Sequence, residues 1–252
     1  MHLAILGASG GVAYNVLLSA LSDTRVDRVS LLLRKPGVFE SNEHVAPAIA
    51  SGRVRVLQGD ATREAELEAL LGADEVDVIV TSIGGAPRLT LRGIVIDQPG
   101  VCTRSALALL RVLARLHATP RVVAVSSMGI GDNHALMPLP LRILYPWLLH
   151  TPHQDKEGLE YLLQRAASAL PTPRDVPSVL SASDAATAPE AFLPEVVVVR
   201  PALLTDGAGE HEVKAAEDAY TYYVSRADVG RFIARRCLIG DEWVNKMPVV
   251  GY

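Results

Sequence analysis

Short apolar runs alternate with amphipathic segments along most of the chain. Parallel strands covered on both faces have such runs, because neither of their sides meets water. The runs predict strands over 1–6, 28–33, 54–57, 76–81, 121–126 and 195–200. Helices are expected from Val12, over 63–71 and 101–117, from Pro152 and from Ser225. This order predicts an α/β fold: one domain with a doubly wound parallel sheet, helices on both faces and a small C-terminal extension beside the substrate.

Four stretches depart from this alternation. Residues 88–100 are expected to be irregular, and residues 220–224 are expected to pair with the edge of the sheet. Residues 132–151 are apolar and rich in proline, which favours a loop that serves as a lid or an interface. Residues 166–194 are rich in Ala, Ser, Pro and Thr and are predicted to be a mobile insertion.

The opening stretch, MHLAILGASGGVAYN, has the pattern of a strand, a tight turn and a helix. Of the three glycines Gly7, Gly10 and Gly11, the first permits the turn and the second lets the backbone approach a pyrophosphate, while Ala13 lets the helix and the strand pack closely. The N–H groups at the start of the helix then face that phosphate. We therefore expect a Rossmann-like dinucleotide site at this turn.

Charged residues follow the next two strands. Arg34 comes directly after the second strand, where the adenosine ribose lies in this kind of fold. A guanidinium there binds a 2′-phosphate, so Arg34 favours NADP(H) over NAD(H). Lys35 is interpreted as an ordinary solvated charge. Asp60, after the third strand, would either hold the adenine amino group or cap the helix that begins near Thr62.

Small residues end the fourth and fifth strands. Ser82, Ile83 and Gly84 follow the fourth strand and offer a second close approach to the cofactor. Ser127 and Met128 lie at the tip of the fifth strand, on the expected nicotinamide side. Serines also end strands for local reasons, and both interpretations stay open here.

Composition excludes several classes of function. The 252 residues carry a net charge of -4 without a basic arm, so no nucleic acid is expected as a partner. No signal peptide or membrane span is predicted, and Cys102 and Cys237 lie in apolar helical patterns as reduced core residues. We therefore expect a cytoplasmic protein. No metal site is expected, because His150 and His153 lack ligand partners at a recognisable spacing.

Several motifs together resemble those of a known family. They are GASGGVA at Gly7, the arginine at position 34, GDAT at Gly59, VSS at Val125, RPALLTDG at Arg200 and VSRADVGRF at Val224. The set resembles the atypical short-chain dehydrogenase/reductases, near the NmrA-like regulators and the biliverdin and flavin reductases. Fungal members share the segment LLHTPHQDKEGLE. The resemblance extends the expected cofactor site to Ser9, Val12, Ala61, Lys156, Pro201 and Leu203.

The resemblance also shows two departures at the expected active site. If Lys156 is the active-site lysine, the tyrosine expected four residues earlier is replaced by Pro152, which can exchange no proton. The histidine that follows the proline of the sixth-strand motif in the flavin reductases is replaced by Ala202. Ser127 matches the serine that those enzymes place beside the nicotinamide. Ser127, Lys156 and His153 are therefore the candidate catalytic residues.

Loss of the tyrosine disfavours the reduction of simple ketones, which needs a positioned acid. We therefore expect an NADPH-dependent reductase of a conjugated or aromatic small molecule such as a flavin, quinone or enone. Tyr145 and Trp147 would stack on this substrate beneath the lid, and Met128 would line its pocket. The alternatives are a non-catalytic NADP(H) sensor that docks a protein partner or a second copy through the apolar loop, and a non-redox isomerase or cyclase.

Overall fold

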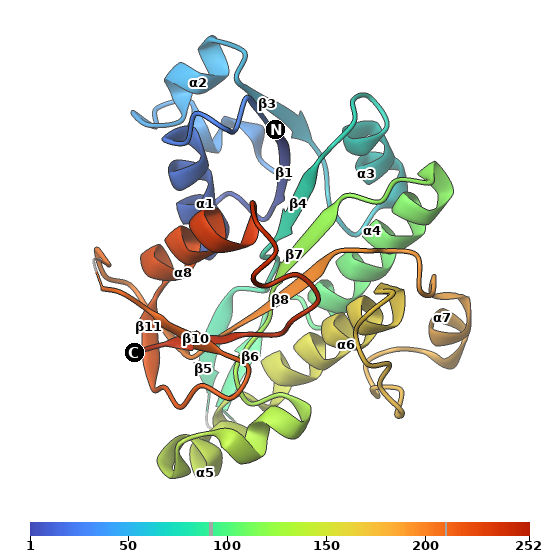
Figure 1. The fold of residues 1–252 in the computed structure, drawn as a ribbon, viewed down its shortest axis with the longest axis vertical. Helices are drawn as coiled ribbons and strands as arrows, with labels where there is room; N and C mark the ends of the chain where they lie inside the picture. The colour runs from blue at the N-terminus through green and yellow to red at the C-terminus, as the bar shows by residue number, and fades with distance from the viewer. Residues whose placement is uncertain (91–92, 210) are drawn as a thin grey trace.

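The computed structural model describes residues 1–90, 93–209 and 211–252. Its centre is an eight-stranded sheet in the order β10-β12-β8-β7-β4-β1-β2-β3, parallel throughout except for β10 (Figure 1). The strands are β1 (His2–Leu6), β2 (Arg28–Leu33), β3 (Val54–Gln58), β4 (Val78–Thr81), β7 (Arg121–Val125), β8 (Val196–Pro201), β10 (Lys214–Ala216) and β12 (Val249–Gly251). The predicted doubly wound sheet is confirmed.

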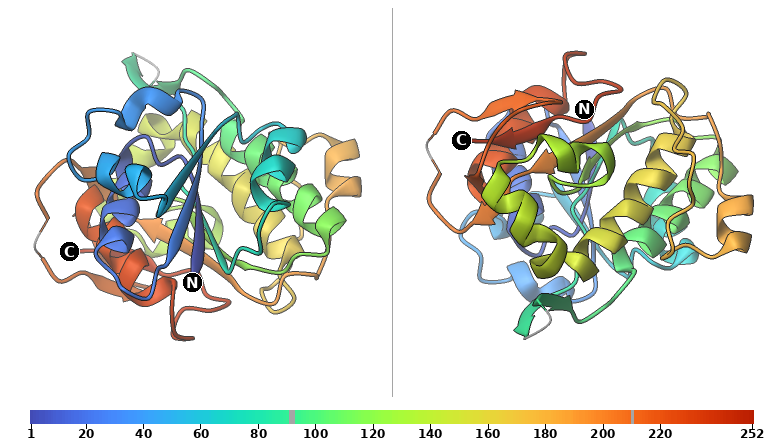
Figure 2. Two further views of the ribbon diagram at one scale, coloured as in Figure 1. Left: turned by 90° about the horizontal axis from the view of Figure 1, so that it is seen from above. Right: turned by 90° about the horizontal axis from the view of Figure 1, so that it is seen from below.

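Helices cover both faces of this sheet (Figure 2). One face carries α1 (Gly11–Leu21), α2 (Ala46–Ala50) and α8 (Arg226–Phe232), which continues as a π-helical turn, η3 (Ile233–Cys237). The other carries α3 (Glu64–Leu71), α4 (Val101–Leu116), α6 (His150–Ala166) and α7 (Ala182–Thr187). Each face has its own apolar core: the first core lies between the sheet and α1, and the second between the sheet and α4. Strand residues alternate between them, so that Ile5 belongs to the first core and Leu6 to the second. Burial on both faces explains the uninterrupted apolar runs.

The strand order reverses between β1 and β4. From β1 the chain adds β2 and β3 on one side, and it then returns to add β4, β7 and β8 on the other. A Cβ atom on Gly7, just after β1, would lie 2.8 Å from the carbonyl oxygen of Ser82, just after β4. Gly7 also has φ +90°, which favours glycine. The two strand ends therefore meet at the switch point, where ligands bind in such sheets.

Two segments that were expected to be irregular have regular structure. Within 88–100, β5 (Pro87–Thr90) and β6 (Gly93–Ile96) pair as antiparallel strands, and residues 91–92 lie outside the described residues. Within 132–151, the 3-10 turn η2 (Gly131–Leu136) precedes helix α5 (Leu139–Leu148). The loop prediction was wrong because two of the prolines lie at the start of the helix, where their missing N–H groups cost little.

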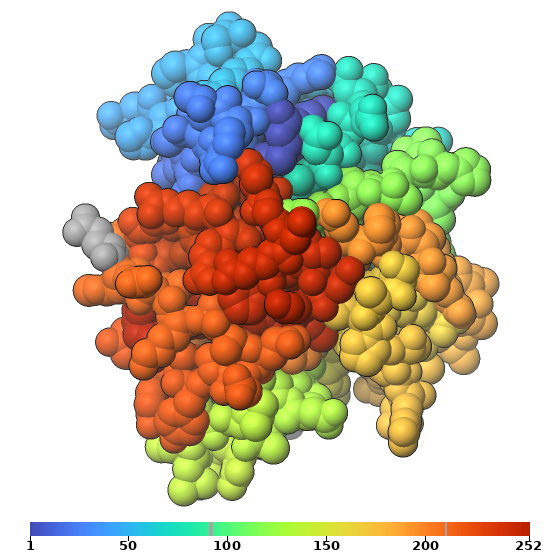
Figure 3. All heavy atoms as spheres, in the orientation of Figure 1, coloured from blue at the N-terminus to red at the C-terminus, as the bar shows by residue number. Residues whose placement is uncertain are grey.

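The C-terminal third covers the centre of one face, between the N-terminal residues and α5 (Figure 3). Residues 220–224 were expected to pair with the edge of the main sheet, but β11 (Tyr223–Ser225) does not join it. It pairs in parallel with β9 (Leu203–Thr205) as a separate ribbon. Helix α8 begins next to Ser225, as predicted, and Ser225 caps it, because its hydroxyl accepts the N–H of Asp228 at 3.0 Å.

Residues 166–194 pack against the second core. They contain α7, and seven of their apolar side chains are buried: Ala166, Ala167, Leu170, Leu180, Ala185, Ala188 and Leu193. The mobility of this segment stays a prediction. The 3-10 turn η1 (Pro36–Phe39) follows β2 and buries Phe39 against α1.

Candidate functional site

A cleft of about 680 Å³ opens at the carboxyl ends of the central strands. Twelve of the fourteen predicted cofactor residues line it: Gly7, Ser9, Gly10, Gly11, Val12, Arg34, Asp60, Ala61, Ser82, Ile83, Gly84 and Lys156. Its volume lies within the usual range for sites that hold small molecules and cofactors. The structure thus brings together residues from the ends of four strands, β1 to β4, and from α6.

The floor of the cleft consists of glycine-rich backbone. A Cβ atom added to Gly10, Gly11 or Gly84 would meet no described atom within 4 Å, so open space lies directly above these residues. Gly11 is also the first residue of α1 and has φ +61°. A negatively charged group above this turn would face the free N–H groups at the start of the helix.

Lys156 extends from α6 into the wall of the cleft. Its ammonium donates hydrogen bonds to the carbonyl oxygens of Ile83 at 3.1 Å and of Val125 at 2.8 Å. These oxygens belong to the ends of β4 and β7, so the lysine is fixed at the sheet edge. An ammonium has three donors, and these carbonyls use two of them.

Asp155, beside Lys156, is a buried structural residue. It is 1% exposed, and its carboxylate accepts the N–H groups of Cys102 at 3.0 Å and Thr103 at 2.8 Å. Asp155 therefore satisfies the first turn of α4 and ties that helix to α6. Cys102 is buried and free, and burial raises the pKa of its thiol to about 11.

The adenosine end of the cleft contains Arg34 and Asp60. Asp60 does not cap α3, which begins two residues after Thr62; instead its carboxylate accepts the N–H and the hydroxyl of Thr62 at 2.9 and 2.8 Å. Burial disfavours the ionised form, but the hydrogen bonds from Thr62 and the charge of Arg34 outweigh it, so the pKa of Asp60 is lowered. The exposed guanidinium of Arg34 lines the cleft.

The structure differs from the prediction around the end of β8 and in β9. Pro201 and Leu203 do not line the cleft, whereas their neighbour Leu204 does, together with Arg226. Leu204 belongs to β9, and Arg226 is the first residue of α8, directly after β11, so segments distant in the sequence form this wall. The VSRADVGRF motif was the available signal for Arg226, but it was assigned only to a helix start.

The serine pair after β7 divides between two positions. Ser126, and not Ser127, lines the cleft, and the Ser126 hydroxyl is buried without a hydrogen-bond partner in the described residues. Ser127 lies next to it, with its Oγ 3.2 Å from His153 Nε2. A buried unpartnered hydroxyl in a cleft wall is a group that a ligand can satisfy.

His153 is not the exposed helix residue that the sequence suggested. Burial, with a smaller contribution from His134, lowers its pKa to about 4, so the imidazole is neutral near pH 7. Its ring lies edge-on to Tyr145, with 5.6 Å between the ring centres. His150, three residues earlier, is exposed.

The predicted substrate residues do not form a stacking surface in this structure. Tyr145 and Met128 are each 1% exposed and belong to the first core. Trp147 is 52% exposed on α5, but no residue of 132–151 is among those that line the cleft. The lid stays a prediction, whereas stacking by Tyr145 is excluded while it lies buried in the core.

A larger hollow of about 830 Å³ lies on the far side of α6, against residues 171–177. Its wall includes the buried pair of Glu160 and Arg200, whose closest atoms are 2.6 Å apart. Of the predicted cofactor residues, none lines this hollow. No helix in the described residues is both long and apolar enough to cross a bilayer.

Comparison with known proteins agrees with this geometry. The family model described as NAD(P)H-binding matches residues 7–169. The chain is 27% identical to Reductase pytE of Aspergillus terreus, over 92% of this chain and 89% of that protein. It is 26% identical to Oxidase pynE of Aspergillus niger, over 97% of this chain and 96% of that protein.

Solved structures show the same fold. The anaerobillin reductase ChuY of Escherichia coli O157:H7 aligns with a TM-score of 0.66 at 19% identity, over 100% of this chain and 97% of that one. A wide-type short-chain dehydrogenase/reductase of Veillonella parvula, solved in complex with NADP, aligns with a TM-score of 0.65 at 15% identity, over 100% and 94%. The chain therefore belongs to the NAD(P)H-binding family of atypical short-chain dehydrogenase/reductases.

Proposed function

We propose that this protein is an NADPH-dependent reductase that transfers hydride to a conjugated or aromatic small molecule of the flavin, quinone or enone type. The observation that carries the proposal is the convergence of the glycine turn, Arg34 and Lys156 on one cleft. The turn suits a pyrophosphate, the guanidinium suits a 2′-phosphate, and the ammonium suits a ribose hydroxyl.

The residues present fit this cofactor. Open space above Gly10 and Gly84 leaves room for it at two strand ends. The third donor of Lys156 is available for the nicotinamide ribose, and the unpartnered hydroxyl of Ser126 offers a further polar contact. The bound cofactor supplies the hydride, and the protein binds and orients both reactants.

The proton chemistry favours an acceptor that delocalises charge. Pro152 occupies the position of the expected tyrosine acid, and His153 is neutral near pH 7. A simple ketone would need a stronger positioned acid as the alkoxide develops. A flavin, quinone or enone spreads that charge and can take its proton from water. Ser127, oriented by His153, would then position a heteroatom of the substrate.

The names of the two fungal relatives support redox chemistry, since one is a reductase and the other an oxidase. They differ in the direction of the reaction. The redox class is thus what we carry over from them, and reduction rests on the preference for NADPH argued from Arg34.

The cofactor preference is tested with two neighbouring cations. Arg34→Glu should weaken NADPH binding at least about tenfold and reverse the preference towards NADH, because the carboxylate repels the 2′-phosphate. Lys35→Glu makes the same change of charge beside the cleft, where Lys35 is not a lining residue. Equal effects of the two substitutions on NADPH, or an unchanged preference in Arg34→Glu, would contradict the assignment.

The reaction is tested with a panel of acceptors. Purified protein is mixed with NADPH and with flavins, quinones, enones and simple ketones, and the nicotinamide absorbance is followed. We expect turnover with one or more of the conjugated acceptors and none with the ketones. Turnover of ketones alone would contradict the proposed substrate class.

A second candidate function is a redox sensor that binds NADP(H) and docks a protein partner. The exposed apolar side chains of α5 and the β5–β6 hairpin favour it: Leu89 is 75%, Ile143 73% and Trp147 52% exposed. Apolar side chains gathered in this way are typical of an interaction surface. Tight NADPH binding without turnover across the panel would favour the sensor over the reductase.

A further inference from the structure

The ribbon of β9 and β11 brings two opposite charges to one end. The two strands are parallel, and Thr205 pairs with Ser225 as the last residue of each. Asp206 and Arg226 follow directly, and Arg226 Nη1 lies 2.6 Å from Asp206 Oδ1. Strand pairing therefore fixes an ion pair between residues twenty positions apart.

Arg226 lies where two hollows meet. It lines the cofactor cleft with Gly11, and it also lines an adjoining hollow of about 510 Å³ with Gly11, Tyr14 and Asp206. Gly11 is the first residue of α1, so the guanidinium is next to the phosphate-binding turn. Arg226 is thus a cation beside this turn, in addition to Arg34 and Lys156.

The backbone and the guanidinium of Arg226 are held with very different strength. Its backbone begins α8, where the Ser225 hydroxyl accepts the N–H of Asp228 and the buried Asp228 carboxylate accepts the Ser225 hydroxyl at 2.9 Å. Its guanidinium, in contrast, pairs with a carboxylate whose side chain is 89% exposed. An exposed ion pair is weak, whereas a pair of guanidinium and phosphate can be bidentate and strong.

We propose that the pair of Asp206 and Arg226 is a latch on the cofactor site. The pyrophosphate of a bound dinucleotide takes the guanidinium from Asp206, and residues 204–209 then lie against the bound cofactor. The carboxylate of Asp206 thus competes with the phosphates for Arg226 and lowers the affinity for the cofactor. The latch rests on the proposed function, and it assigns Arg226 to the pyrophosphate that NADPH and NADH share.

The test compares two substitutions with opposite expected signs. Asp206→Asn removes the competitor and should tighten NADPH binding about two- to fivefold at low salt, the worth of an exposed pair. Arg226→Gln should weaken it about tenfold or more. Both factors should be the same for NADH, because the pyrophosphate is common, and both should shrink as salt is added. Binding is measured by titration of the nicotinamide fluorescence.

A matched control removes a carboxylate elsewhere. Glu68, on α3, pairs with Arg115 at 2.9 Å and does not line the cleft, so Glu68→Gln makes the same change of net charge without touching the latch. It should leave both affinities unchanged. Arg226→Lys keeps the charge and should retain most of the binding, which keeps the test valid if Arg226→Gln folds poorly.

The outcomes separate the latch from the proposed function. Wild-type protein that binds NADPH and reduces an acceptor, with an unchanged or weakened affinity in Asp206→Asn, overturns the latch alone. Equal tightening in Asp206→Asn and Glu68→Gln also overturns it, because the effect is then one of net charge. Wild-type protein that binds no NADPH overturns the proposed function and the latch together.

Discussion

His153 shows how the surroundings of a single side chain change its chemistry. Its Nε2 lies 3.2 Å from the Ser127 hydroxyl, and its ring lies against the buried Tyr145. Burial makes the imidazolium costly, so the pKa falls from 6.5 to about 4. Within that interval the unfolded chain binds a proton that the folded protein does not.

This difference predicts a pH dependence of stability. The stabilisation is fully present above pH 6.5 and is lost as the pH falls towards 4, because protonation then favours the unfolded state. The free energy of unfolding should decrease over this interval by roughly 2–3 kcal/mol more in the wild type than in His153→Gln. Denaturant titrations at several pH values measure the difference.

The exposed His150, on the same helix, provides the control for this experiment. His150→Gln should follow the wild-type pH dependence, because it removes an exposed imidazole and leaves the buried His153 in place. A His153→Gln profile parallel to that of the wild type would mean that the imidazole titrates normally in the folded protein.

Among the secondary-structure elements, α4 and α6 are connected by Asp155. Its carboxylate caps α4 from within α6, and it also accepts the Thr103 hydroxyl at 3.0 Å. Asp155→Ala would leave buried N–H groups of Cys102 and Thr103 without acceptors, so we expect a loss of about 2–3 kcal/mol in the free energy of unfolding. Lys156 is the next residue, so NADPH affinity should decrease as well.

Ser181 offers a comparison with an exposed cap. Its hydroxyl accepts the N–H of Asp184 at 3.1 Å at the start of the short helix α7. Ser181→Ala should cost about 1 kcal/mol or less and should leave NADPH affinity unchanged. Equal losses of stability and affinity in the two variants would show that the α4–α6 connection does not position the lysine.

The elements also show what the sequence can predict. Strand β2 has the predicted bounds, because a strand that is buried on both faces consists of a continuous run of apolar residues. The helix α5 was missed because its prolines read as breakers, although Pro140 lies in its first turn. The glycine turn and Arg34 could be placed because each is adjacent to a strand end. Arg226 could not, because its position depends on the pairing of β9 with a strand twenty residues further on.

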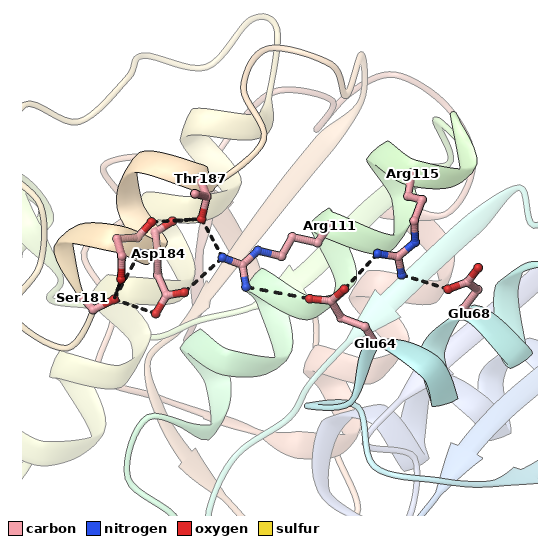
Figure 4. A network of polar contacts seen from close by, with 8 residues as sticks. Glu64, Glu68, Arg111, Arg115, Ser181, Asp184 and Thr187 are labelled. Atoms are coloured by element: carbon pink, nitrogen blue, oxygen red, sulfur yellow. Dashed lines mark hydrogen bonds and ion pairs between the residues drawn. The ribbon is translucent and has the colours of Figure 1, made fainter.

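At the scale of the whole molecule, the question is what holds residues 166–194 on the domain. Two kinds of contact are present. Arg111 on α4 donates to Asp184 at 3.0 Å and to Thr187 at 2.7 Å on α7, and also faces Glu64 on α3 (Figure 4). Beneath this network Leu180 is 7% exposed and Leu193 fully buried.

The magnitudes decide in favour of the apolar contacts. Partly exposed ion pairs contribute about 0–1 kcal/mol, whereas truncation of a buried leucine to alanine costs about 2–5 kcal/mol. Leu180→Ala should therefore speed protease cleavage and hydrogen exchange within residues 166–194, and Arg111→Gln should change them little. Neither residue lines the cleft, so NADPH affinity should stay at the wild-type value in both variants. Faster cleavage in Arg111→Gln than in Leu180→Ala would show that the polar network holds the segment, and rapid exchange in the wild type would confirm the mobile insertion that its composition predicts.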